Sequence, residues 1–404
     1  MSVNLKDLLI KQLFGLINAP LEIKKDSSLN CHVLQTLEKC LKFCLNPHED
    51  SNDIIFAIKF VLNYLYDELN TGHWSKVPIE TRQNYTIASF VEALLLLQLS
   101  NKIDTDLLQQ CLKSVDMGLL LGAPINNNEE LLTETAKIIR EQLVEEPVVI
   151  NQANTDKECI VNIIAENKIE ELEVPSLETF ISKFFNPQLP LKLKGCMTHW
   201  PATTKWQDLN YLLKIAGNRT VPIELGSRYT DEDWGQKLMT LRDFIKEHYL
   251  SEHGNIGYLA QHNLFDQISE LKEDIRVPEY CCCSLNYEES TEPDINAWLG
   301  PKGTVSPLHQ DPKNNILAQV YGYKQLILFS PEDTPYLYPH EDTLLSNTAQ
   351  IDPINPDYEK FPKFKLAKMY KCVLGPGEML FLPVKWWHHV TALTKSFSVS
   401  FWWQ

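Results

Sequence analysis

Residues 296–331 read NAWLGPKGTVSPLHQDPKNNILAQVYGYKQLILFSP, and this stretch decides the fold of the C-terminal part of the chain. Its short apolar runs are separated by Gly, Pro and Asn, which is the spacing of strands in a β-sandwich or barrel. We expect strands at 295–299, 316–321 and 324–329. Gly322 lies between the last two, so the sequence predicts that they form a hairpin.

The flanking sequence continues the same pattern. The segment SFSVSFWW at 396–403 alternates serine with apolar residues, which predicts a half-buried strand. A Gly-Pro-Gly turn at 375–377 precedes another expected strand at 379–382. The other expected elements are strands at 221–225 and 256–260 and helices at 176–185 and 238–249. Residues 176–404 are therefore expected to form a jelly-roll-like barrel with flanking helices.

The first part of the chain is helical. Apolar residues recur there at three and four positions, the period of one helix face, and prolines fall between the periodic segments. We expect five or six antiparallel helices over 1–145, as a bundle or short solenoid, and an acidic linker over 146–175. Since no catalytic cluster occurs in 1–145, this domain is expected to bind another protein.

Composition limits the partners of this chain. Its 404 residues are 44% hydrophobic and 22% charged, which is ordinary globular composition. The net charge is -16, and residues 1–175 contribute 15 basic and 26 acidic side chains. Such a surface does not hold nucleic acid by charge, and it suits a basic partner. No apolar run is long enough to span a membrane, and no secretory signal is evident.

A candidate metal site follows from His309-Gln310-Asp311. In extended backbone, residues i and i+2 project to the same face, so this imidazole and this carboxylate can meet one metal. A third ligand can come from the Trp-Trp-His-His sequence at 386–389, where His388 and His389 point to opposite faces and only one should bind. Two histidines and one carboxylate form the facial triad of non-haem Fe(II) oxygenases.

The three stretches 296–331, 372–393 and 396–403 together resemble the JmjC-domain oxygenases, with high specificity over about residues 176–404. That resemblance implies an α+β chain in which a helical domain precedes a double-stranded β-helix of the jelly-roll or cupin type. It also implies Fe(II), 2-oxoglutarate and dioxygen as reactants, with succinate and CO2 as coproducts. By it, His309, Asp311 and His388 ligate the iron, and His389 does not.

The resemblance also implies the cosubstrate site. Lys324 should pair with the distal carboxylate of 2-oxoglutarate, and Trp298 should form a wall of the cavity. Trp402 should close the same cavity, and we expect Trp386 and Trp387 to cluster around it. The expected hydrogen-bond donors to the cosubstrate are Tyr258, Ser306 and Asn315. A buried dicarboxylate needs such a counter-charge and such donors.

For the substrate, the resemblance implies two reactions. One is C3-hydroxylation of arginine side chains in proteins, and the other is demethylation of dimethylated lysine 36 of histone H3. The segment VPIELGSRY offers Glu224 as a partner for a guanidinium, with Tyr229 and Trp234 as walls, and so favours arginine. A histone-tail peptidase and a non-enzymatic scaffold are less favoured alternatives. The family and the missing signal suggest residence in the nucleus and cytoplasm.

Overall fold

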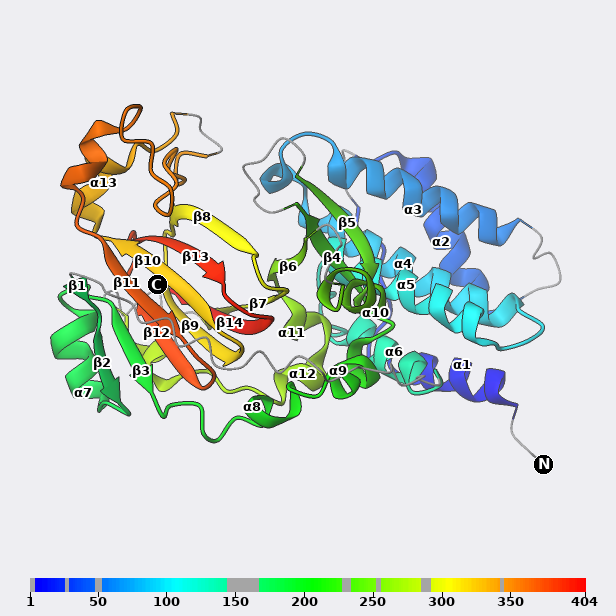
Figure 1. Ribbon diagram of the computed structural model, residues 1–404. Coiled ribbons are helices and arrows are strands. Elements are labelled where there is room, and N and C mark those ends of the chain that lie inside the picture. Colours follow the sequence, from blue (N-terminus) through cyan, green and yellow to red (C-terminus); the bar gives the residue numbers. More distant parts are fainter. Residues whose placement is uncertain are drawn as a thin grey trace. The chain divides into compact units, whose positions relative to one another are not determined.

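The computed structural model describes residues 4–25, 29–47, 53–143, 167–226, 234–251, 256–284, 292–341 and 345–404. The chain divides into two compact units. The first unit comprises Met1–Glu146 with Ala216–Thr220, and the second comprises Pro147–Ile215 with Val221–Gln404. Figure 1 labels the elements of both units. Among the described residues, no helix combines the length and the apolar character needed to cross a membrane.

The first unit is all helical, as the sequence predicts. Helix α4 is its centre, with buried side chains on every face, and α3 and α5 pack against it. Asn4, Asn30 and Asp104 cap helices through side-chain oxygens that accept backbone N–H groups. The described helices are α1 (Leu5–Gly15), α2 (Cys31–Leu45), α3 (Ile54–Asn70), α4 (Ile79–Leu99), α5 (Thr105–Leu121) and α6 (Leu131–Arg140).

The second unit contains two sheets. One has the strand order β1-β11-β10-β13-β8, and the other has the order β2-β3-β12-β9-β14-β7-β6-β4-β5. Figure 1 shows β8, β13, β10 and β11 side by side. The strands are β1 (Asn167–Lys168), β2 (Glu170–Glu173), β3 (Leu191–Lys194), β4 (Thr220–Leu225), β5 (Gly235–Thr240), β6 (Gly257–His262), β7 (Asp294–Gly300), β8 (Val305–Gln310), β9 (Asn314–Tyr321), β10 (Lys324–Phe329), β11 (Tyr370–Leu374), β12 (Glu378–Leu382), β13 (Trp387–Ala392) and β14 (Ser396–Trp403).

Short helices flank these sheets. They are α7 (Leu177–Phe180), α8 (Ala202–Lys205), α9 (Leu209–Ala216), α10 (Leu241–Phe244), α11 (Leu264–Gln267), α12 (Ser269–Lys272) and α13 (Thr334–Leu337). The helix expected at 238–249 begins only at Leu241, because Thr240 caps it and the residues before it form β5. With helices beside a two-sheet barrel, the α+β jelly-roll prediction is confirmed.

The predicted hairpin is wrong. Strand β9 pairs with β12 and β14 in one sheet, whereas β10 pairs with β11 and β13 in the other. Gly322 joins them at a φ of +76°, and a Cβ there would lie 2.0 Å from the Lys395 carbonyl oxygen. The connection therefore carries the chain from one sheet to the other. Such a crossing requires a glycine at positive φ, as a tight hairpin turn also does.

Two further expectations are corrected. The last strand is not half-buried, because Ser396, Ser398 and Ser400 are as inaccessible to solvent as the apolar residues between them. Part of the expected linker is sheet, since β1 pairs in parallel with β11 and β2 pairs in parallel with β3. Glu171 there forms ion pairs with Lys192 and Lys194 of β3, so its charge serves strand pairing.

An insertion at 331–369 connects β10 to β11 and contains α13 (Figure 1). Its segment at 347–349 covers the free edge of β8. There Gln310 donates its backbone N–H to Asn347, and Ala349 donates to Leu308. Strand β8 is thus an edge strand whose open backbone groups are satisfied by the insertion.

Candidate active site

Strands β8 and β13 bring three candidate ligands together. His309 lies on β8, Asp311 follows the strand directly, and His388 on β13 stands opposite His309 in the antiparallel register. The His309 and His388 ring centroids are 4.2 Å apart. The alternation of side chains along extended backbone places Asp311 on the same face as His309, as the sequence predicts.

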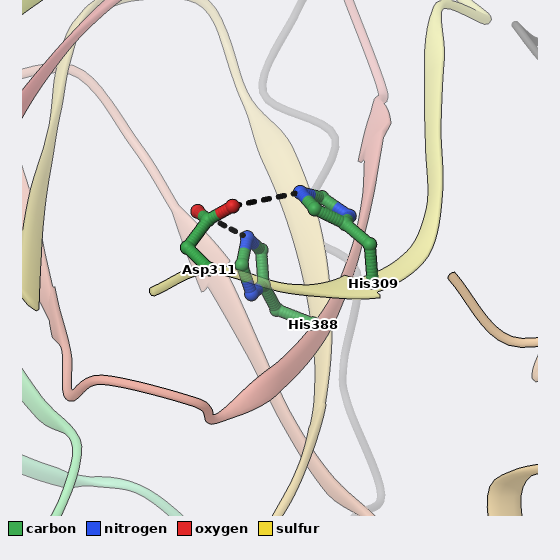
Figure 2. A group of neighbouring side chains, drawn as sticks. All are labelled: His309, Asp311 and His388. Carbon is green, nitrogen blue, oxygen red and sulfur yellow. Dashed lines mark ion pairs between the residues drawn. The ribbon is translucent and has the colours of Figure 1, made fainter. Parts of the chain in front are cut away.

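The geometry of this cluster suits one metal ion. Figure 2 shows all three side chains pointing toward a common point. One ligand atom from each lies within 4.8 Å of the others. The Asp311 carboxylate oxygens are 3.9 Å from His309 Nε2 and 3.6 Å from His388 Nε2. Among the described residues, no other group of His, Cys, Asp and Glu has this arrangement.

Backbone carbonyls fix the tautomers of both histidines. His309 Nδ1 is 2.7 Å from the Pro307 oxygen, and His388 Nδ1 is 3.0 Å from the Trp386 oxygen. A carbonyl only accepts, so each Nδ1 carries the proton and each Nε2 presents its lone pair to the cluster. Burial, together with the neighbouring His309, lowers the pKa of His388 to about 4. His388 is therefore neutral at physiological pH, as a metal ligand requires.

A cavity adjoins this cluster. Every residue that the resemblance assigned to the cosubstrate lines it, and these residues come from six different strands. Four lining residues were not predicted. The alternation of serine with apolar residues in the last strand is the sequence feature that could have identified Ser400 as a lining residue. No such feature marks Leu317, Leu382 or Val390. The lining consists of Tyr258, Trp298, Ser306, His309, Asp311, Asn315, Leu317, Lys324, Leu382, His388, Val390, Ser400 and Trp402.

Lys324 is a buried cation in this cavity. Its side chain is 2% exposed, and its Nζ donates a hydrogen bond of 3.2 Å to the Tyr258 hydroxyl. No carboxylate in the described part of the chain lies within ion-pair distance of it. Burial lowers the pKa of Lys324 to about 7, because nothing there offsets the lost hydration of the charged form. Lys324 is therefore available as the counter-charge for an anionic ligand.

Other buried polar atoms at the cavity are also unsatisfied. Within the described residues, Asp311 Oδ2, Asn315 Oδ1 and Trp402 Nε1 have no hydrogen-bond partner. Native proteins rarely leave such atoms unpaired unless a ligand, ion or water meets them. Together with Lys324, they fit a metal ion next to a small dicarboxylate. The residues present thus match the chemistry of Fe(II) and 2-oxoglutarate.

Gly300 keeps the cavity wall in place. A Cβ on Gly300 would lie 2.7 Å from the Tyr258 ring and 2.8 Å from the Thr304 methyl group. Tyr258 in turn hydrogen-bonds Ser306, and its ring centroid is 6.1 Å from that of Trp298. The absence of a side chain at 300 therefore lets the tyrosine reach Lys324.

The predicted substrate residues have different outcomes. Glu224 on β4 lies opposite Tyr258 on β6 in the antiparallel register, so it lies beside the cavity without lining it. Burial raises its pKa, and a hydrogen bond from Trp234 partly offsets that effect. Trp234 is 38% exposed. Tyr229 lies outside the described residues.

Two of the four tryptophans expected around the cavity do not line it. Trp386 donates its indole N–H to the Gln188 carbonyl, and Trp387 donates to the Thr334 hydroxyl. Trp386 belongs to the hydrophobic cluster that includes cavity-lining residues such as Leu317 and Leu382, whereas Trp387 packs in a separate cluster. Only Trp298 and Trp402 line the cavity. Trp386 and Trp387, which directly precede His388, therefore support this ligand through packing.

Comparison with known proteins agrees with this geometry. Residues 176–404 match the family described as Cupin-like domain. The chain is 44% identical over 359 residues to "Lysine-specific demethylase 8" of Danio rerio, covering 85% of this chain and 86% of that protein. It is 44% identical over 346 residues to "Jumonji C domain-containing protein 5" of Drosophila melanogaster, covering 84% of each. It is 35% identical over 367 residues to "Lysine-specific demethylase JMJ30" of Arabidopsis thaliana, covering 84% and 83%.

Proposed function

This chain belongs to the cupin-like JmjC family of Fe(II)- and 2-oxoglutarate-dependent dioxygenases, and we propose that it hydroxylates arginine side chains of protein substrates. His309, Asp311 and His388 would hold the iron. When bound, Fe(II) with 2-oxoglutarate supplies the oxidising power to insert one oxygen atom of O2 into a C–H bond, with succinate and CO2 as coproducts. The three protein ligands on one face leave positions free for the reactants.

The chain's own residues orient the cosubstrate. Lys324 provides the counter-charge for the distal carboxylate, and Tyr258 holds the ammonium in position through their hydrogen bond. The Trp402 N–H and the Asn315 amide supply polar contacts that the described residues leave unmet. The apolar walls of Leu317, Leu382 and Val390 exclude water, which strengthens each of these electrostatic contacts.

Glu224 is the observation that favours arginine. It is a partly buried carboxylate beside the cavity, and the Trp234 indole fixes its direction. A guanidinium offers several N–H donors in a fixed plane, which a positioned carboxylate can accept in pairs. A guanidinium bound there restores the charged form of Glu224, whose pKa is raised when the site holds no cation.

Demethylation of dimethyl-lysine 36 of histone H3 is the second candidate. Two of the relatives reported above carry the name lysine-specific demethylase, and Trp234 beside Glu224 offers an aromatic face to a methylated ammonium. Both reactions use the same metal site and begin with oxidation of a C–H bond. They differ in the side chain that Glu224 and Trp234 hold.

Product mass distinguishes the two reactions. Arginine peptides and dimethyl-lysine peptides are incubated with enzyme, Fe(II), 2-oxoglutarate and O2. We expect the arginine peptide to gain one oxygen atom, and loss of methyl groups from the lysine peptide alone would refute the proposal. His309→Ala is expected to abolish succinate formation in both reactions while the circular dichroism spectrum is unchanged.

Glu224→Gln tests the substrate contact. We expect kcat/KM for the arginine peptide to fall about 10–100-fold, since a charge-assisted contact is lost. The KM for 2-oxoglutarate should stay within twofold. Glu178→Gln, at an exposed position on α7, is the matched control and should leave both unchanged. Equal losses for peptide and cosubstrate would place Glu224 in the cavity rather than in the substrate site.

We further propose a basic protein segment as the substrate, a protein partner for the helical unit, and residence in both nucleus and cytoplasm. Residues 1–175, which contain the helical unit and the segment after it, carry -11 of the net charge of -16, and this charge attracts basic proteins at long range. Fractionation of cells that express a tagged chain tests the location. Co-purification with and without residues 1–146 tests the partner of the helical unit.

A further inference from the structure

A basic surface lies on the insertion between β10 and β11. The sequence DYEKFPKFKLAKMYK at 357–371 contains five lysines and two acidic residues, in a chain whose net charge is -16. We call five of its exposed residues, Tyr358, Lys360, Lys363, Lys365 and Leu366, the lysine surface. Asp357, Glu359 and Lys368 are exposed in the same stretch.

The lysine surface is exposed, and its three lysines outnumber the exposed carboxylates of Asp357 and Glu359 in the same stretch. Lys360, Lys363 and Lys365 form no ion pair with any carboxylate of the described residues. Lys360 Nζ is 5.0 Å from the Phe361 ring centroid, and Lys365 Nζ is 5.2 Å from that of Tyr358. Leu366 is 66% exposed and Tyr358 is 45% exposed. Cations beside exposed apolar side chains can bind an anionic group and bury carbon surface in the same contact.

A short path connects this surface with the metal ligands. Thr348 of the insertion pairs with His309, and the adjacent Pro339 pairs with Ala349. Tyr338 directly precedes Pro339 in the chain, and its hydroxyl accepts the Lys363 backbone N–H at 2.9 Å. The length of the path from His309 to Lys363 is therefore two strand spacings of about 4.8 Å each plus the length of one tyrosine side chain. An extended peptide at about 3.4 Å per residue covers it with about five residues.

We propose that the lysine surface binds an acidic stretch of the protein substrate, about four to six residues away from the basic residue that is oxidised. The inference rests on the proposed function and names a second feature of its substrates. Glu224 selects the basic residue, and the lysine surface selects the acidic flank. The rest of the chain is acidic and repels such a flank, so the contact also fixes the orientation of the substrate.

A protein segment fits this surface better than nucleic acid. The net charge of -16 opposes a polyanion that extends beyond the three lysines. Leu366 and Tyr358 offer apolar contact to side chains of a peptide. A peptide in which a few acidic residues alternate with apolar residues meets both features.

Peptide pairs test the inference. Each peptide carries the residue that the enzyme oxidises, either arginine or dimethyl-lysine, with three glutamates four to six positions away on the N- or C-terminal side. Matched peptides carry glutamines in their place. We expect one glutamate peptide to have a KM about tenfold below that of its glutamine partner, with kcat unchanged and the difference reduced at high salt.

A triple variant assigns the effect to the surface. Lys360→Gln/Lys363→Gln/Lys365→Gln should raise the KM of the favoured peptide about tenfold and leave the glutamine peptide and the KM for 2-oxoglutarate unchanged. The matched control is Lys183→Gln/Lys237→Gln/Lys246→Gln, at exposed positions on other elements of the same unit, and it should behave as wild type.

Several outcomes would overturn the inference. Equal KM values for glutamate and glutamine peptides on both sides would do so. So would a triple variant that retains the preference, or one that loses only binding to single-stranded RNA or to vesicles of anionic lipid. In each case the enzyme still oxidises its peptide, so the proposed function survives. Absence of any oxidised product would instead refute the proposed function.

Discussion

Replacing Lys324 by Met should change stability and cosubstrate binding in opposite directions. The lysine is 2% exposed, and burial moves its pKa from 10.5 to about 7. At about 1.4 kcal/mol per pKa unit, the protein without ligand at pH 7 loses about 4 kcal/mol by burying this group. Methionine fills similar space without charge, so Lys324→Met should recover about 2–4 kcal/mol, less a small packing defect.

The same substitution should remove 2-oxoglutarate binding. An anion buried without its partner costs about 3–5 kcal/mol, so Kd should rise at least about 100-fold. Differential scanning fluorimetry without cosubstrate measures the first effect, expected as a rise of about 5–10 °C in Tm. Isothermal titration calorimetry with 2-oxoglutarate measures the second. Lys302→Met, at an exposed lysine, is the control and should change neither. A variant that bound 2-oxoglutarate within tenfold of wild type would refute the role of Lys324.

Three further predictions concern pH, the cavity wall and the core. Lys324 must be protonated to bind a dicarboxylate and has a pKa of about 7 in the free protein, so the Kd for 2-oxoglutarate should rise up to tenfold per pH unit above pH 7. Calorimetry from pH 6 to 9 checks this, and a flat profile would contradict it. Gly300→Ala should push Tyr258 off Lys324 and raise the KM for 2-oxoglutarate about tenfold, with a small loss of stability. Succinate formation at varied 2-oxoglutarate checks it, and an unchanged KM would show that the tyrosine ring is free to move. Asp274→Asn should lower stability by about 2–4 kcal/mol, because this buried carboxylate accepts hydrogen bonds from Trp206, Tyr211 and Lys205. Urea unfolding measures the change, and a loss below 1 kcal/mol would mean that the network tolerates a neutral amide.

The metal ligands could be predicted because their geometry is local in the sequence. His309 and Asp311 share a face by the period of extended backbone alone. The choice of His388 over His389 required the family resemblance, because the two alternate across one strand and residue type does not separate them. The structure supplies the reason, since His388 stands opposite His309 in the register.

Other features depend on the fold and could not be predicted from local sequence. Gly322 has the same local sequence whether the chain turns back on itself or crosses between sheets, and only the pairing of β9 with β14 distinguishes the two. Lys324 and Ser400 have the polarity of surface residues, and the cavity that buries them is built from strands far apart in the chain. The lysine surface is local, so a net charge taken over half of the chain does not reveal it.

The pairing of β8 with β13 sets the order in which a nascent chain can acquire its metal. His309 and Asp311 leave the ribosome early, whereas His388 follows only after the insertion, β11 and β12 have been synthesised. A chain that ends before β13 offers two ligands, too few for the complete site. The third arrives by a contact of high sequence separation, whose loop-closure entropy opposes its formation until neighbouring strands have paired. All three iron ligands therefore come together only when the barrel has closed. A partly made chain has no complete site at which iron could react with oxygen.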